Sequence, residues 1–169
     1  FGNNLLTFDR FLLQILKKNI PRVHRAPSSL CRNILRSLLI KNNYKTFEHF
    51  RDYPGIVSEL ASTLIALKKN GLTPQSAELF FQAHITPELK SLIQIFSDYQ
   101  NRLRDIDYYD DGDLVITTLK LLKEGILEFP QEIASIYWDR IFPLTLGERE
   151  IIKELNRQFP NLNLVVSYS

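Results

Sequence analysis

The chain has 169 residues, 44% of them hydrophobic, and a formal net charge of +2 at pH 7. This length suffices for one sizeable core or two small ones, and no apolar run approaches the roughly 20 residues that span a bilayer, which argues against a membrane protein. The single cysteine, Cys31, excludes an internal disulfide framework, and its apolar helical neighbours predict a buried structural thiol in a cytoplasmic protein.

Charge is distributed unevenly along the chain. Residues 1–50 carry nine Lys and Arg against two Asp and Glu, a net of +7, whereas residues 51–169 have a net of −5. This asymmetry indicates a polyanion-facing N-terminal end, although a solvated basic face would have the same composition. Because the chain starts at Phe1 and contains no methionine, we expect a fragment of a longer protein.

The N-terminal part is expected to hold the end of a strand followed by two helices. Residues 4–6 look like the last part of the strand, and Thr7 is a plausible N-cap for a helix that starts at Phe8. An irregular basic segment bounded by prolines covers residues 20–27. A second helix, with one of the two serines at its start as N-cap, is predicted over residues 28–41.

The middle of the chain predicts several helices in succession. A short helix is expected at residues 46–51, and the next one runs from the Tyr-Pro pair at 53–54 to a left-handed Asn-Gly C-cap at 70–71. Thr-Pro pairs then open a helix to about residue 83 and a long one to about residue 106. A further amphipathic helix is predicted over residues 113–123.

The C-terminal part reads as a strand, a helix and a strand. Residues 135–138 predict a buried strand, residues 146–159 a helix capped by Thr145, and residues 162–168 a second strand. Such a unit favours a parallel pair with the helix on one face. The expected fold class is therefore α/β but predominantly α, with many helices beside a partial parallel sheet.

The first strand of this unit ends in Asp139 and is followed by Arg140. In nucleotide-hydrolysing helicases an apolar strand leads to Asp-Glu, because the aspartate helps to hold Mg²⁺ and the glutamate orients the attacking water. A guanidinium cannot act as a carboxylate base, and no Gly-x-x-x-x-Gly-Lys-[Ser/Thr] loop is present. Asp139 and Arg140 therefore mark a degenerate Walker B position, and we expect a non-catalytic fragment that uses no cofactor.

Other chemistry-bearing residues fit known sites poorly. In the acidic cluster at residues 105–113, a calcium loop would place Tyr109 and Thr118 where ligands are needed, so these carboxylates are better explained as helix-start caps. The three histidines, His24, His49 and His84, have no partner at metal-ligand spacing. A metal-dependent nuclease that uses residues 105–113 remains an alternative, which Asp110→Ala and Asp113→Ala variants would test.

The best candidate for a functional surface is the basic N-terminal third. Arg22 and Arg25 lie in the proline-bounded segment and could contact phosphates. Thr7 at a helix start offers backbone N–H groups to the same partner.

Four short motifs occur in the order in which they stand in one protein family. Residues 6–11 (LTFDRF) look like the Thr-Phe motif that follows the second core strand in helicases and lies along single-stranded DNA. Residues 53–74 are similar to a helical insertion with the pattern Pro-Gly, Glu-Leu, Leu-Lys-x-x-Gly-Leu-x-Pro. Residues 99–103 and 110–114 look like its Tyr-x-x-x-Leu and Asp-x-x-Asp-Leu pair, and residues 139–148 follow its Asp, Thr and Glu positions.

On these motifs the chain resembles the B subunit of AddAB-type (RexAB-type) bacterial helicase-nucleases. The resemblance implies a superfamily 1 helicase-like region without ATP turnover, with residues 1–19 and 133–169 in the α/β core and residues 20–132 in a helical insertion domain. It implies single-stranded DNA and a helicase-nuclease partner subunit as partners, in recombination and repair. The predicted DNA contacts are Thr7 and Phe8 of the Thr-Phe motif, together with Arg22 and Arg25 of the basic segment. A helical protein-interaction module that holds a partner subunit is the alternative.

Overall fold

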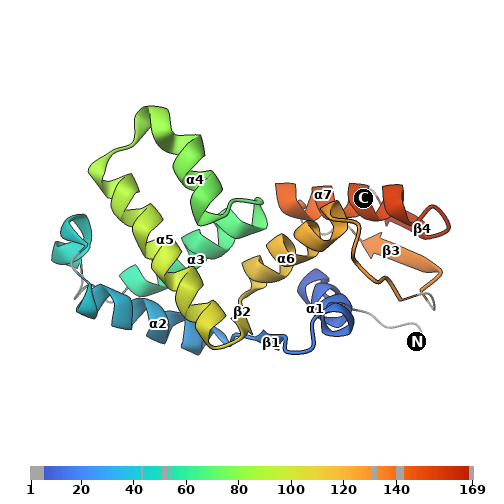
Figure 1. Ribbon diagram of the computed structural model, residues 1–169, viewed down its shortest axis with the longest axis horizontal. Coiled ribbons are helices and arrows are strands. Elements are labelled where there is room, and N and C mark those ends of the chain that lie inside the picture. Colours follow the sequence, from blue (N-terminus) through green and yellow to red (C-terminus); the bar gives the residue numbers. More distant parts are fainter. Residues whose placement is uncertain are drawn as a thin grey trace.

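The computed structural model describes residues 6–42, 44–50, 53, 55–130, 133–139 and 143–167. Within these ranges the chain forms a helical lobe and an α/β lobe that lie side by side (Figure 1). Of the predicted strand at residues 4–6, only Leu6 is among the described residues. Arg140 lies outside them. No described helix has the length and hydropathy needed to cross a bilayer.

The helical lobe is built from the helical elements in the first two thirds of the chain that follow α1. They are α2 (Ser28–Lys41), η1 (Lys45–Phe50), α3 (Ile56–Lys69), α4 (Pro74–Phe81), η2 (Gln82–His84) and α5 (Pro87–Asp105). Their apolar stripes meet in one core, in which Leu35, Leu64, Phe96 and Leu103 are fully buried. Cys31 is also buried in this core, and burial raises the pKa of its thiol, as expected for a structural cysteine.

The helix ends in this lobe follow local chemistry. Thr73 and Thr86 cap α4 and α5 with their side chains, and Gly71 adopts a positive φ of 84° at the end of α3, as the sequence predicts. The predicted serine cap of α2 is wrong, because Pro27 occupies the N-cap position and Ser28 is already helical. The short helix η1 is of the 3₁₀ type.

The α/β lobe surrounds a second core. Its elements are α1 (Phe8–Asn19), α6 (Asp111–Lys123), β3 (Ser135–Asp139), α7 (Leu146–Gln158) and β4 (Asn163–Ser167). Strands β3 and β4 are parallel, with Tyr137 opposite Val165, so the predicted strand–helix–strand unit is confirmed. The predicted burial of the first strand is wrong, because the side chain of Tyr137 is 75% exposed. The molecule is thus predominantly helical with a small parallel sheet, as the sequence predicts.

A second parallel pair, which the sequence does not predict, joins the lobes. Strand β1 (His24–Arg25) pairs with β2 (Tyr108–Tyr109), and the N–H group of Ala26 extends the pairing to the carbonyl of Tyr109. Helix α6 follows directly after β2 and buries its side chains in the second core, although the sequence assigns it to the helical insertion. The division of the chain into domains remains a prediction.

Candidate nucleic-acid interface

The N-terminus of α1 carries two of the predicted DNA contacts. The hydroxyl oxygen of Thr7 accepts a hydrogen bond from the backbone N–H of Arg10 at 3.4 Å, and Thr7 itself is exposed. Phe8 is half-buried at the edge of the second core, with its ring 6.2 Å from that of Phe11. Thr7 is therefore placed to meet a partner in solvent, whereas Phe8 mainly fixes the helix to the lobe.

The N-termini of α1 and α7 both meet the C-terminal end of α3. The ammonium of Lys69 lies 2.9 Å from Asp9 in the first turn of α1 and 3.9 Å from Glu148 in the first turn of α7. The amide oxygen of Asn70 accepts a hydrogen bond from the N–H of Leu146. Because the C-terminal end of a helix is electronegative and the N-terminal end is electropositive, this arrangement is electrostatically favourable.

The N-terminus of α6 meets the same end of α3 through a buried ionic network. The ammonium of Lys68 lies 2.7 Å from Asp110 and 3.0 Å from Asp113, and all three side chains are almost completely buried. The hydroxyl of Tyr99 donates to Asp110 at 2.9 Å, and the amide of Gln100 donates to Asp113 at 2.8 Å. The two aspartates also form a capping box at the start of α6.

This network holds two carboxyl groups but a single ammonium. Burial, and next the charge of Asp110, raise the pKa of Asp113 to about 6, against the opposing influence of Lys68. Burial also raises the pKa of Tyr99 far above its ordinary value, so this phenol stays a hydrogen-bond donor. The network is therefore sensitive to pH in the weakly acidic range.

The acidic cluster that suggested a metal site is engaged in these structural contacts. Asp110 and Asp113 form ion pairs with Lys68. Asp111 forms a bidentate ion pair with Arg25, whose Nε and Nη2 atoms lie 2.7 and 3.0 Å from the two carboxylate oxygens. Among the described residues, no group of three or more His, Cys, Asp and Glu side chains is arranged to hold a metal ion.

The two predicted arginine contacts differ in their surroundings. Asp111 raises the pKa of Arg25 through their hydrogen bond, and a phosphate would have to compete with this carboxylate. Arg22 is exposed in the turn before β1 and forms no ion pair with any residue that the structure describes. Arg22 is thus the more available of the two guanidinium groups.

The position that the sequence predicts to be a degenerate Walker B motif lies at the carboxyl end of β3. Asp139 is the last residue of this strand, next to Ser167 of β4, and Arg140 is outside the described residues. The motif residues that follow have a structural role: Thr145 and Glu148 form the capping box of α7, and Glu148 is buried beside Lys69. Their spacing is accordingly explained by helix capping.

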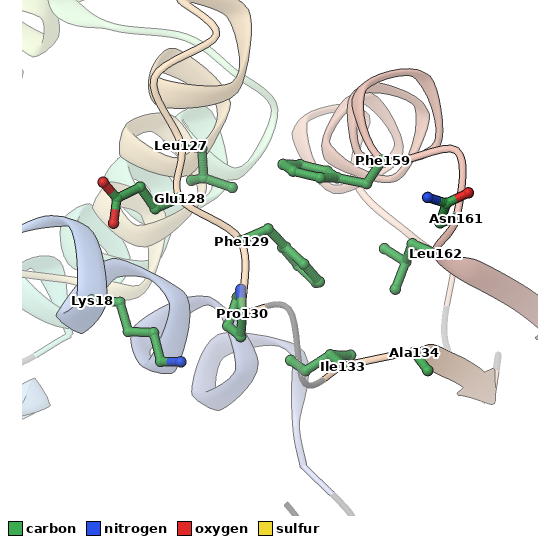
Figure 2. Close-up of a pocket in the computed structure, with 10 residues that line it drawn as sticks. All are labelled: Lys18, Leu127, Glu128, Phe129, Pro130, Ile133, Ala134, Phe159, Asn161 and Leu162. Carbon is green, nitrogen blue, oxygen red and sulfur yellow. The ribbon is translucent and has the colours of Figure 1, made fainter.

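A pocket of about 930 Å³ opens at the opposite edge of the sheet. Ala134 and Leu162, which line it, directly precede β3 and β4. The rings of Phe129 and Phe159, which also line it, lie 5.0 Å apart (Figure 2). Ligands of open α/β sheets bind at the carboxyl ends of the strands. This pocket at the amino ends is therefore distinct from the place where a helicase binds its nucleotide.

The sequence matches the model of the UvrD/REP helicase N-terminal domain over residues 2–159. The chain belongs to this family. No curated protein matches the sequence. The match spans the α1 start at Thr7, the helical lobe and the α/β lobe up to the end of α7, including the strand that ends in Asp139, but not β4. A UvrD/REP helicase domain implies a DNA helicase-related role and association with DNA.

Within this UvrD/REP domain, the motifs noted in the sequence come together at one place. Residues 67–74, 99–103 and 110–114 supply the buried network, since Lys68, Tyr99 and Asp110 meet there. Sequence reasoning does not single out Lys68. The available signal is its position four residues after Leu64, in the apolar stripe of α3, where a lysine requires a buried anion.

Proposed function

We propose that this UvrD/REP domain is a non-catalytic, helicase-like part of an AddAB-type (RexAB-type) B subunit in the cytoplasm. It binds or guides single-stranded DNA for a helicase-nuclease that acts in recombination and repair, together with a partner subunit. Residues 1–19 and 133–169 belong to the α/β core, and residues 20–132 form the insertion. This proposal is supported most by the match to a helicase family, taken together with the arginine, Arg140, that follows Asp139 at the position that we predict to be Walker B.

The proposed DNA contacts are Thr7, Phe8, Arg22 and Arg25. Thr7 caps α1, whose first N–H groups can donate to a phosphate oxygen, and Arg22 is exposed with its guanidinium unpaired among the described residues. Arg25 is ion-paired with Asp111. Its guanidinium can therefore bind a phosphate only if it contacts both anions or releases the carboxylate. Phe8 supports the turn from its half-buried position.

Fluorescence polarisation with a labelled oligonucleotide tests this function. We expect micromolar or weaker binding at low salt that fades as the salt concentration rises, because displaced counterions drive the association. Arg22→Ala should reduce the slope of log affinity against log salt by about 0.7, the value for one single-stranded phosphate. Lys120→Ala, which removes an exposed cation from α6, is the matched control. Absence of binding by the unmodified chain at low salt would contradict the proposal.

A second candidate function is a helical module that holds a partner subunit. Leu79 and Phe80 on α4 favour it, because each side chain is 72% exposed. Two adjacent large apolar side chains in solvent are typical of protein contact surfaces. Capture of the partner subunit that survives high salt, together with no nucleic-acid signal, would favour this function over DNA binding.

A further inference from the structure

Helix α2 has an exposed face with cations and without anions. Ser29, Arg32, Asn33, Arg36 and Ile40 are exposed at helical spacing, and Ser28 and Lys41 are exposed at the two ends of the helix. Arg32 and Arg36 are four residues apart, so they project from the same face of the helix. Since α2 contains no Asp or Glu, nothing on the helix itself neutralises them.

Two of the exposed cations on α7 are paired locally. Lys153 lies 2.6 Å from Glu150, and Arg157 lies 2.7 Å from Glu154. By contrast, neither Arg32 nor Arg36 forms an ion pair or hydrogen bond with any residue in the described ranges. The two arginines are therefore available to an external anion.

Exposed aromatic side chains follow α2 in the chain. The chain leaves α2 after Lys41 and continues into η1, at the outer end of the helical lobe (Figure 1). Phe50 at the end of η1 is 48% exposed, and Tyr53 is 64% exposed. Their ring centroids are 5.8 Å apart with planes inclined at 52°, so the two rings form a small apolar platform in solvent.

We propose that the exposed face of α2 and the Phe50–Tyr53 pair form a binding surface for single-stranded DNA. Arg32 and Arg36 contact backbone phosphates, and bases stack on the two rings. This inference rests on the proposed function and gives the strand a path over the helical lobe, away from Thr7. The face runs along α2, a helix of 14 residues that is about 21 Å long. This length accommodates several phosphates of a DNA strand.

The chemistry of the surface favours single-stranded DNA over an acidic protein. Guanidinium groups bind phosphates in a bidentate manner and are weakly hydrated. Unpaired bases stack on exposed aromatic rings irrespective of sequence. An acidic peptide would use the arginines but would gain little from Phe50 and Tyr53.

The test measures the fluorescence polarisation of a fluorescein-labelled oligothymidylate as the full 169-residue chain is added, at a series of salt concentrations. The double variant Arg32→Ala, Arg36→Ala should bind more weakly and lower the salt slope by about 1.4, the value for two single-stranded phosphates. Tyr53→Ala should weaken binding about fivefold or more at an unchanged slope, and Tyr53→Trp should restore it. The control variant Lys120→Ala, Lys153→Ala removes the same charge from α6 and α7 and should keep the slope.

The outcomes separate this inference from the proposed function. If the unmodified chain does not bind the oligonucleotide, both are overturned. If it binds but the double arginine variant, with an unchanged circular dichroism spectrum, keeps the full slope, the α2 surface is overturned and the proposed function stands. If polyglutamate competes fully and Tyr53→Ala binds normally, the surface serves an acidic protein and this inference is again overturned.

Discussion

At the scale of single residues, the most informative side chain is Lys68. Its ammonium is fully buried. It has two carboxylate partners there and lies 4.9 Å from the centre of the Tyr99 ring. A buried cation is tolerated only when anions and hydrogen bonds replace its water. With two aspartates facing one lysine, the site carries an excess negative charge unless one carboxyl group takes up a proton.

This excess charge gives a pH dependence that Asp113→Asn should remove. The pKa of Asp113 is about 6 in the folded chain, above its ordinary value of 3.8, so the folded state binds more protons between these limits. The free energy of unfolding of the unmodified chain, relative to the variant, should therefore rise as the pH falls from 7 to 5. Urea unfolding at both pH values measures this difference, and an equal difference at the two values would contradict the assignment.

In the site around Lys68, the sequence predicts the role of the two aspartates but not the position of the lysine. The capping role of Asp110 and Asp113 follows from local spacing, and it is confirmed. Their cation comes from a helix about 40 residues earlier in the chain, and only the crossing of α3 and α6 brings Lys68 to them. Arg25 is likewise recognisable as basic, whereas its pairing with Asp111 depends on the unpredicted β1–β2 contact.

At the scale of elements, helix ends are well determined by sequence because their signals are local. The Thr-Pro starts of α4 and α5 and the glycine after α3 lie where the pattern places them. The parallel pairing of β3 with β4 follows from the intervening helix. The two-residue strands β1 and β2 could not be predicted in this way, because their pairing depends on how distant segments pack.

The crossing of α3 and α6 depends on a glycine. A methyl group at Gly112 would lie 2.5 Å from Cβ of Lys68 and 3.0 Å from the carbonyl oxygen of Ile65. Gly112→Ala should therefore lower the free energy of unfolding by about 1–3 kcal/mol, despite the better helix propensity of alanine. Thermal or urea unfolding measures the change.

Gly55→Ala is the control for this substitution. A methyl group at Gly55 would have no neighbouring atom within 4 Å among the described residues, and the φ of −88° at this position suits any residue. This variant should have nearly unchanged stability. Equal stability of the Gly112 and Gly55 variants would contradict the close helix crossing.

At the scale of the whole molecule, two separate cores are connected through the packing of α3 on α6. The helical lobe and the α/β lobe each bury their own apolar cluster, and α3 packs on α6 between them. The ionic network of Lys68 lies at this contact. We infer that it makes the two lobes unfold together.

The replacement Lys68→Met tests this cooperativity. Trp138, the only tryptophan, reports on the α/β lobe through its fluorescence, whereas far-ultraviolet circular dichroism mainly reports on the helices. In urea the two midpoints should coincide for the unmodified chain. In the variant, two unneutralised carboxylates should cost about 3–5 kcal/mol and separate the midpoints. Separate midpoints in the unmodified chain would contradict the inference.

The end of α3 also determines where the chain tolerates changes in length. Lys68, Lys69 and Asn70 are consecutive, and each contacts the start of a different helix: α6, α1 and α7. One extra residue inserted in α3 ahead of them would rotate all three side chains by about 100° around the helix axis. All these contacts would be lost in a single event, so an insertion or deletion in α3 should separate it from three helices at once.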